Sequence, residues 1–342
     1  MTDKQWSELI SIVKGEKRKH VSIGFIIDSP WLPNWYGINI FDYFTSDTLW
    51  FKANLKAIET YPGVLFLPGF WSEYGMCTEP SAFGAKCIFW KNEFPFAEKT
   101  IHSTDDILKL KLPNPASDGL LPFMLNRLVN TCPDIEMAGH KIRFSVSRGP
   151  LNVASFLMGT TELLTSMMME PEAVHKLLRI ITDFLKSWHK LQRETFSSID
   201  GIMMLDDIVG FIGEQEFLEF GYPYFRELYD EKVSVKLFHN DADCSMSVKY
   251  YPELGINLFN PGTHMTVKDL IKITGNKLTI LGNIPPRDVL ASGTHEEIHE
   301  TVTKLLADNP DHTRLILSCG GGMPPDVTTE NINAFITAAR SK

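Results

Sequence analysis

Several features are missing from this sequence, and each absence excludes a class of protein. No run of about 18 uninterrupted apolar residues is present, so no membrane-spanning helix is expected. The first residues, Met1–Trp6, lack the pattern of a secretory signal peptide. The five cysteines are odd in number and widely scattered, which argues against a disulfide framework and for a reducing compartment. We therefore expect a cytoplasmic protein without a membrane partner.

Basic residues are also in short supply. The chain has 33 Lys and Arg against 42 Asp and Glu, a net charge of −9. This balance argues against a nucleic-acid partner. No Gly-x-Gly-x-x-Gly follows an early strand, so a dinucleotide-binding Rossmann domain is not expected. The glycine run 320–322 lacks the Lys-Ser/Thr of a phosphate-binding P-loop.

What the sequence does contain is a regular alternation of apolar runs and amphipathic helical segments. Eight apolar runs predict strands. They are Val21–Ile27, Val64–Leu67, Ile142–Val146, Gly201–Leu205, Ser234–Phe238, Ile256–Phe259, Leu278–Leu281 and Arg314–Leu317. Each is followed by helical sequence, which predicts an α/β protein of the TIM (β/α)8 barrel class. We expect one barrel domain over residues 1–342, opened by a helix at Thr2–Lys14.

Between the second and third predicted strands lies a long insertion, at about residues 70–141, which is rich in aromatics and irregular in pattern. Loops of this length are usually functional or carry a subdomain. Aromatic residues gather here and after the first strand, among them Trp31 and Trp71. They predict either an apolar pocket for a planar organic substrate or a lid that packs its own core.

The polar residues that follow the strands carry the chemistry. In an α/β barrel the active site forms at the carboxyl ends of the strands. His239 and Asp241 stand two apart at one strand end, so both side chains can face one point. With Cys319 they offer nitrogen, oxygen and sulfur ligands, which zinc accepts while keeping a position open. The alternative is a hydrogen-bonded histidine, a solvated aspartate and an inert thiol beside a glycine turn.

Four more carboxyl groups and one arginine are candidates. Asp206 and Asp207 are adjacent, so at most one is expected in the mouth while the other caps a helical turn. Glu73 and Glu79 lie among the aromatics of the insertion, where burial would suit a general acid; surface exposure is the alternative. Arg148 is expected either to clamp a substrate carboxylate or to pair with Asp206.

Three segments resemble one family, and the order of elements along nearly the whole chain is similar to that family as well. Leu281–Pro286, Leu315–Pro325 and Asp206-Asp207 with its following residues are similar to the uroporphyrinogen decarboxylase superfamily, whose fold is the same barrel. The decarboxylases of that superfamily carry an Arg-Gln-Ala-Gly-Arg-Tyr type signature after the first strand and an aspartate after the second. Here Ile27–Trp31 and Pro68–Trp71 stand at those places, so porphyrinogen decarboxylation is not expected.

The other branch comprises zinc methyltransferases that exchange methyl groups with corrinoid proteins. The resemblance implies a His-x-Cys at strand five and a Cys at strand eight as zinc ligands; His239 and Cys319 match, whereas Asp241 stands where cysteine would be. A carboxylate makes the metal harder, which favours polarising an ether oxygen. Phe70–Gly84 is similar to the branch that demethylates methoxylated aromatics.

The resemblance therefore implies methyl transfer from a methoxylated aromatic to the cobalt of a corrinoid (cobalamin) carried by a partner protein. Zn²⁺ would be held by His239, Asp241 and Cys319, with Glu73 and Asp207 as catalytic groups. The residues expected to contact substrate are Trp31, Trp71, Met76, Glu79, Arg148, Asp206 and Asn283. Methyl transfer from a methylcorrinoid to a thiol or tetrahydrofolate, decarboxylation, and non-catalytic tetrapyrrole binding stay open as alternatives, as does a homodimer.

Overall fold

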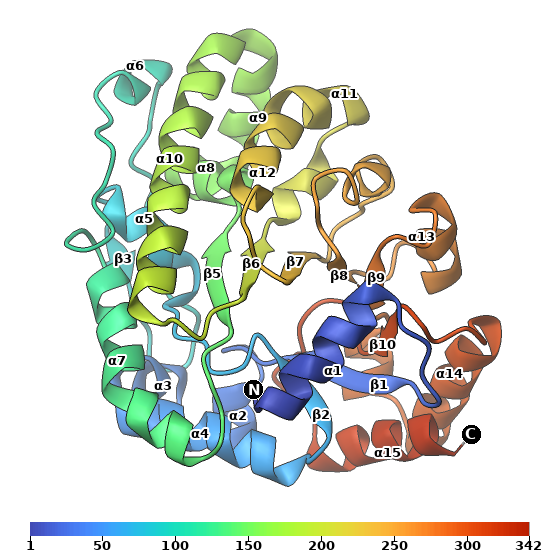
Figure 1. Cartoon of the computed structure of the whole chain (residues 1–342). Helices are drawn as coiled ribbons and strands as arrows, with labels where there is room; N and C mark the ends of the chain where they lie inside the picture. Colours follow the sequence, from blue (N-terminus) through green and yellow to red (C-terminus); the bar gives the residue numbers. More distant parts are fainter. Residues whose placement is uncertain (342) are drawn as a thin grey trace.

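A computed structural model describes residues 1–341 of the chain. Its main element is one parallel eight-stranded sheet in the order β2-β1-β10-β9-β8-β7-β6-β5, curled into a barrel with helices outside (Figure 1). The strands are β1 Ser22–Ile26, β2 Val64–Leu67, β5 Phe144–Arg148, β6 Gly201–Leu205, β7 Val235–Asn240, β8 Leu258–Pro261, β9 Thr279–Leu281 and β10 Leu315–Leu317. The predicted (β/α)8 barrel is confirmed.

The eight predicted strands coincide with the observed ones to within about two residues. Val64–Leu67 and Gly201–Leu205 have the predicted bounds. The largest difference that affects function is in β7, which continues through His239 to Asn240. The predicted strand ended at Phe238 because polar residues follow it. The parallel pairing of β7 nevertheless continues, since His239 pairs with Leu205 and with Asn260. His239 therefore lies inside a strand.

The helices that surround the sheet follow most of the predicted segments. They are α1 Asp3–Lys14, α2 Leu32–Tyr36, α3 Ile40–Thr45, α4 Asp47–Thr60, α5 Thr78–Ala82, α6 Thr104–Ile107, α7 Leu121–Met137, α8 Pro150–Met158, α9 Thr160–Met169, α10 Pro171–Thr195, α11 Glu214–Glu216, α12 Tyr222–Tyr229, α13 Val267–Ile273, α14 His295–Asp308 and α15 Thr329–Arg340. Short turns of 3-10 or π type are η1 Gly75–Cys77, η2 Asp207–Phe211, η3 Phe217–Gly221, η4 Val248–Tyr250 and η5 Pro286–Ala291.

Helix α1 closes the amino-terminal end of the barrel, across which it lies in Figure 1. A capping box between Thr2 and Gln5 starts it, and its apolar side is buried. Trp6 packs edge-on against Phe144 at the start of β5, with ring centroids 5.3 Å apart. Because α1 blocks this end, the opposite end is the one open to a ligand.

The insertion at 70–141 is more ordered than its sequence pattern predicted. It holds the two-stranded hairpin β3 Cys87–Ile88 and β4 Phe96–Ala97, and it ends in the 17-residue helix α7. Pro133 inside α7 obscured the helical pattern in the sequence. Helix α7 occupies the position of the crossover helix between β2 and β5, so the insertion proper is the part before it.

At one seam of the ring of strands, side chains take the place of a neighbouring strand along the edge of β5. Within residues 1–341, no backbone pairing joins β2 to β5. Instead, the side-chain amide of Gln192 on α10 accepts from the Val146 N–H (2.9 Å) and donates to its carbonyl (3.1 Å). The Glu79 carboxylate accepts from the Arg148 N–H at 2.8 Å. These contacts satisfy backbone groups that a neighbouring strand would otherwise pair.

Apolar side chains fill both the barrel interior and the layer between strands and helices. The interior cluster includes Leu65, Val146, Leu237 and Ile316, all nearly inaccessible to solvent. Among the described residues, no helix combines the length and the apolar character needed to cross a membrane.

Candidate active site

A cavity of about 450 Å³ opens at the carboxyl ends of the strands. Its wall combines apolar and ionisable side chains from six of the strand ends and from the insertion. The lining residues are Asp28, Ser29, Pro30, Trp71, Glu73, Gly75, Met76, Phe94, Arg148, Asn152, Phe156, Leu205, Asp207, His239, Asp241, Pro286, Arg287, Gly322, Met323 and Pro324. Residues far apart in sequence thus meet in one mouth, as the barrel predicts.

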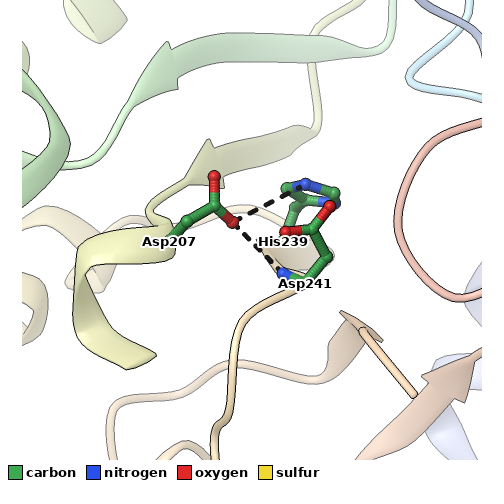
Figure 2. Close-up of side chains that lie close together, drawn as sticks. All are labelled: Asp207, His239 and Asp241. Carbon is green, nitrogen blue, oxygen red and sulfur yellow. Dashed lines mark hydrogen bonds and ion pairs between the residues drawn. The ribbon is translucent and has the colours of Figure 1, made fainter. Parts of the chain in front are cut away.

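Three side chains in this cavity form a cluster that can hold a metal ion. Asp207 follows β6, while His239 and Asp241 come from the end of β7, and one ligand atom from each lies within 4.8 Å of the others. Figure 2 shows Asp207 linked to both neighbours. Its Oδ1 atom is 4.0 Å from His239 Nε2 and accepts a hydrogen bond from the Asp241 N–H at 3.1 Å.

The orientation of the His239 ring is fixed from behind by Asn260. The Asn260 side chain donates through Nδ2 to the Leu281 carbonyl (2.7 Å), which turns its Oδ1 toward His239 Nδ1, also at 2.7 Å. Nδ1 must then carry the proton, and Nε2 keeps its lone pair facing the cavity. This second contact is the usual support of a metal-binding histidine. Asn260 was not among the predicted site residues, although it stands at a strand end beside His239.

Asp206 and Asp207 point in different directions, as expected for adjacent residues. Asp207 lines the cavity, whereas Asp206 is fully buried and accepts from the Leu151 N–H at 2.9 Å, in the first turn of α8. Burial raises the pKa of Asp206 well above its usual value. The helix it caps is the preceding one, α8, rather than the following turn. Asp206 therefore lies outside the cavity wall, away from a substrate.

Cys319 lies behind the cavity wall rather than in the cluster. It is inaccessible to solvent, and its thiol lies 3.7 Å from the Gly321 carbonyl. Burial, with a smaller contribution from the Asp28 carboxyl, raises the pKa of Cys319 to about 12. Of the predicted ligands, the structure brings His239 and Asp241 together with Asp207, and Cys319 is not part of this cluster.

The glycines after Cys319 leave room for two carboxyl groups. A Cβ atom at Gly321, where φ is +72°, would stand 2.8 Å from Asp241 Oδ2. A Cβ at Gly322 would stand 2.6 Å from Asp28 Oδ2. Both distances are shorter than real Cβ contacts, so a side chain at either position would displace the carboxyl group that it meets.

Glu73 was expected to be a general acid, but in the structure its carboxylate accepts hydrogen bonds. It is buried, accepts from Ser29 Oγ (2.6 Å) and forms an ion pair with Arg148 Nη2 (3.3 Å). The Arg148 guanidinium lies over the Trp71 ring, 5.8 Å from its centroid. Both oxygens of Glu73 are therefore engaged, and Arg148 pairs with Glu73 instead of Asp206. The Glu73–Arg148 pair forms part of the cavity wall.

Asp28 is a better-placed proton donor, and it was not among the predicted site residues. Its Oδ1 atom is buried and, within the described chain, has no hydrogen-bond partner. Burial raises the pKa of Asp28 well above the usual range; Glu73 and Asp241 add to the rise, and Arg148 opposes it. A raised pKa favours the protonated form, and a protonated carboxyl group that lines the cavity can donate a proton.

The other predicted substrate contacts divide into two groups. Trp71 and Met76 line the cavity. Trp31 is buried in the outer apolar layer, with its indole N–H on the Val327 carbonyl, and Asn283 holds the loop after β8 through the Gly262 and Met265 carbonyls. Glu79 accepts from the Arg148 N–H at the edge of β5, and burial raises its pKa.

Several lining residues carried no recognisable sequence signal. Phe94 comes from the turn of the β3–β4 hairpin, and Asn152 and Phe156 come from successive turns of α8. Arg287 follows two prolines after β9, a strand-end position that the barrel pattern alone makes a candidate. Finding these residues needed the packing of the insertion against α8, which strand counting does not supply.

The cluster has the chemistry of a zinc or similar divalent site. It supplies one imidazole nitrogen and two carboxylates, all accepted by zinc, at bond lengths of about 2.0–2.1 Å. A tetrahedral ion would bring its ligand atoms to roughly 3.3 Å from each other. The ligand atoms lie within 4.8 Å of one another, so binding an ion would bring them closer together by up to about 1.5 Å. The residues therefore fit such an ion.

Fold and cavity together define a (β/α)8-barrel enzyme whose catalytic mouth is acidic and suited to a divalent metal. The family model described as uroporphyrinogen decarboxylase (URO-D) matches residues 35–342, so the chain belongs to the URO-D family. The expected superfamily membership is thereby confirmed.

Curated relatives and solved structures agree with this assignment. Uroporphyrinogen decarboxylase of Pseudoalteromonas translucida is 24% identical over 304 residues, covering 84% of this chain and 81% of that protein. The enzyme of Shewanella frigidimarina is 26% identical over 275 residues, covering 76% and 75%. A methyltransferase from Methanosarcina mazei shares the fold, with a TM-score of 0.82 at 18% identity over 98% of both chains.

Proposed function

We propose that this protein is a metal-dependent methyltransferase that removes the methyl group of a methoxylated aromatic and passes it to a corrinoid carried by a partner protein. The observation that carries the proposal is the Asp207–His239–Asp241 cluster, with His239 Nε2 held free by Asn260. The resemblance of the fold to the Methanosarcina methyltransferase supports the same reaction class. When bound, zinc supplies Lewis acidity and the corrinoid supplies the methyl acceptor.

The residues of this chain supply positioning and a proton. An apolar part of the cavity wall suits one aromatic ring. It is formed by Trp71, Met76, Phe94 and Phe156. As the methyl carbon–oxygen bond breaks, its electron pair stays on the oxygen, and the methyl group leaves to the acceptor. Asp28 donates the proton that converts the resulting phenolate to a phenol. Holding the ether in this orientation lowers the barrier by proximity.

In this proposal Arg148 and Glu73 stabilise the cavity wall and take no part in the transfer of the methyl group or the proton. Their ion pair is shielded, because the two side chains are only 16% and 5% exposed. Breaking such a pair by removing one partner leaves an uncompensated buried charge, which is strongly destabilising. Glu73→Gln is therefore expected to affect folding and site geometry rather than proton donation alone.

A turnover screen tests the proposal. Purified protein, zinc, a reduced corrinoid protein and a panel of methoxylated aromatics are incubated, and the demethylated phenol is measured. We expect phenol from the wild type, at least 100-fold less from His239→Ala, and a pH-dependent loss in Asp28→Asn. His299, exposed on α14, gives the matched control His299→Ala, which should retain full activity.

Two outcomes of the screen separate the alternatives. Demethylation of methylcobalamin by a thiol or by tetrahydrofolate, without activity on any ether, would replace the proposal with the reverse half-reaction. Decarboxylation is a second candidate because the curated relatives carry that name. Release of CO₂ from uroporphyrinogen would establish it, although Ile27–Trp31 lacks the arginine pair expected of those enzymes.

A further inference from the structure

Arg287 is the cavity-lining cation that the proposed chemistry leaves unused. It stands in η5, directly after Pro285 and Pro286, on the loop that follows β9. Its side chain is exposed and lines the cavity. Across residues 1–341, its guanidinium has no ion pair, hydrogen bond or aromatic contact. The two prolines fix the backbone that presents it.

The contrast with the second arginine of the wall is informative. Arg148 is committed to Glu73 and to the face of Trp71, so it has little capacity left for a ligand. Arg287 keeps all five N–H donors available. The carboxylate clamp was one of two roles expected for Arg148, the other being a pair with Asp206; its ion pair with Glu73 leaves Arg287 as the better-placed partner for a carboxylate.

The charge of the cavity makes an unpaired arginine more significant. Four carboxyl groups and two guanidinium groups line the wall. An anionic ligand would be repelled by the carboxylates unless a cation met its charge. A free arginine at the rim provides such a contact and favours planar, bidentate recognition of a carboxylate. A neutral ligand would gain nothing from it.

We infer that the substrate is an aromatic ether that carries a carboxylate, and that Arg287 is the residue that selects for this charge. The ether end lies toward the Asp207–His239–Asp241 cluster, the ring lies along the apolar wall that includes Trp71, and the carboxylate meets Arg287. This inference rests on the proposed function for the identity of the ether, but the charge preference is a property of the cavity alone.

Calorimetric binding tests the inference without requiring methyl transfer. The zinc-loaded protein is titrated with 3- and 4-methoxybenzoate and with the matching methoxybenzamides, which have the same shape and no charge. We expect the wild type to prefer each acid over its amide by about tenfold or more. Arg287→Gln should weaken binding of the acid roughly ten- to hundredfold and leave binding of the amide within twofold.

A matched control removes the same charge elsewhere. Arg226 is also exposed but lies on α12, against a different depression of the surface. Arg226→Gln should leave both affinities unchanged. An equal loss for acid and amide in Arg287→Gln would overturn the inference, as would a wild type that binds neither acid or shows no preference.

The binding and turnover experiments test the role of Arg287 and the proposed methyl transfer independently. A charge preference that depends on Arg287, in a protein that transfers no methyl group, would keep the selectivity of the cavity and remove the proposed reaction. Methyl transfer from neutral and anionic ethers at equal efficiency would keep the reaction and remove the role of Arg287.

Discussion

Gln192 offers a sharp test of how the barrel is closed. Its amide is the partner of both backbone groups of Val146 on the free edge of β5, at 2.9 and 3.1 Å, and it is 6% exposed. Gln192→Leu keeps the approximate volume and removes both hydrogen bonds. Each buried backbone group left without a partner costs about 1–3 kcal/mol, so for two groups the free energy of unfolding should fall by about 2–6 kcal/mol.

Urea unfolding followed by circular dichroism measures this change. Gln192→Glu should destabilise at least as much, because an ionised carboxylate accepts from the Val146 N–H but faces its carbonyl as an uncompensated buried charge. Gln215 is exposed on α11, and Gln215→Leu should stay within about 0.5 kcal/mol of the wild type. A Gln192→Leu variant as stable as this control would refute the reasoning that a side chain seals the seam.

Three further predictions concern the site and the pH dependence of stability. Asn260→Ala should lower zinc affinity about 10- to 100-fold, measured by competition with a chelator, because the His239 tautomer is no longer fixed; unchanged affinity would contradict it. Burial lowers the pKa of His189 from 6.5 to about 3, so stability should fall by up to about 1.4 kcal/mol per pH unit below pH 6.5, and less steeply in His189→Asn. In the metal-free native protein, Cys319 should react with a disulfide reagent more slowly than the partly exposed Cys132, as mass spectrometry of labelled peptides would show.

The direction of the His189 effect follows from its surroundings. The ring is fully buried between Ser145 and Ser147, whose hydroxyls lie 2.9 and 2.8 Å from its two nitrogens. The folded protein therefore holds a neutral imidazole well below the pH at which the unfolded chain takes up a proton. Stability is fully present above pH 6.5 and is lost as the pH falls toward 3.

Most of the barrel was predictable because its strands are buried on both faces. Continuous apolar runs such as Gly201–Leu205 mark such strands directly. Helix α7 was missed because Pro133 interrupts its pattern. The continuation of β7 through His239 was missed because polar residues at the mouth of a barrel have the composition of a loop.

The candidate site was predictable in location and less so in membership. Strand ends identified His239, Asp241 and Asp207, which the fold brings together. Periodicity placed Cys319 at the same mouth but gave no information on its exposure, and the structure buries it completely. The roles of Asp28 and Asn260 depend on an unpaired buried oxygen and on an amide orientation, neither of which a sequence pattern contains.

The path of a labelled methyl group is the most direct measurement of the proposed reaction. A methoxybenzoate carrying ¹³C in its methyl group is mixed with zinc-loaded protein and one equivalent of reduced corrinoid protein for a single turnover. The label should appear on the cobalt of the corrinoid with the wild type and stay on the ether with His239→Ala. Label transferred equally by both proteins, or by neither, would contradict a methyltransfer site built on Asp207, His239 and Asp241.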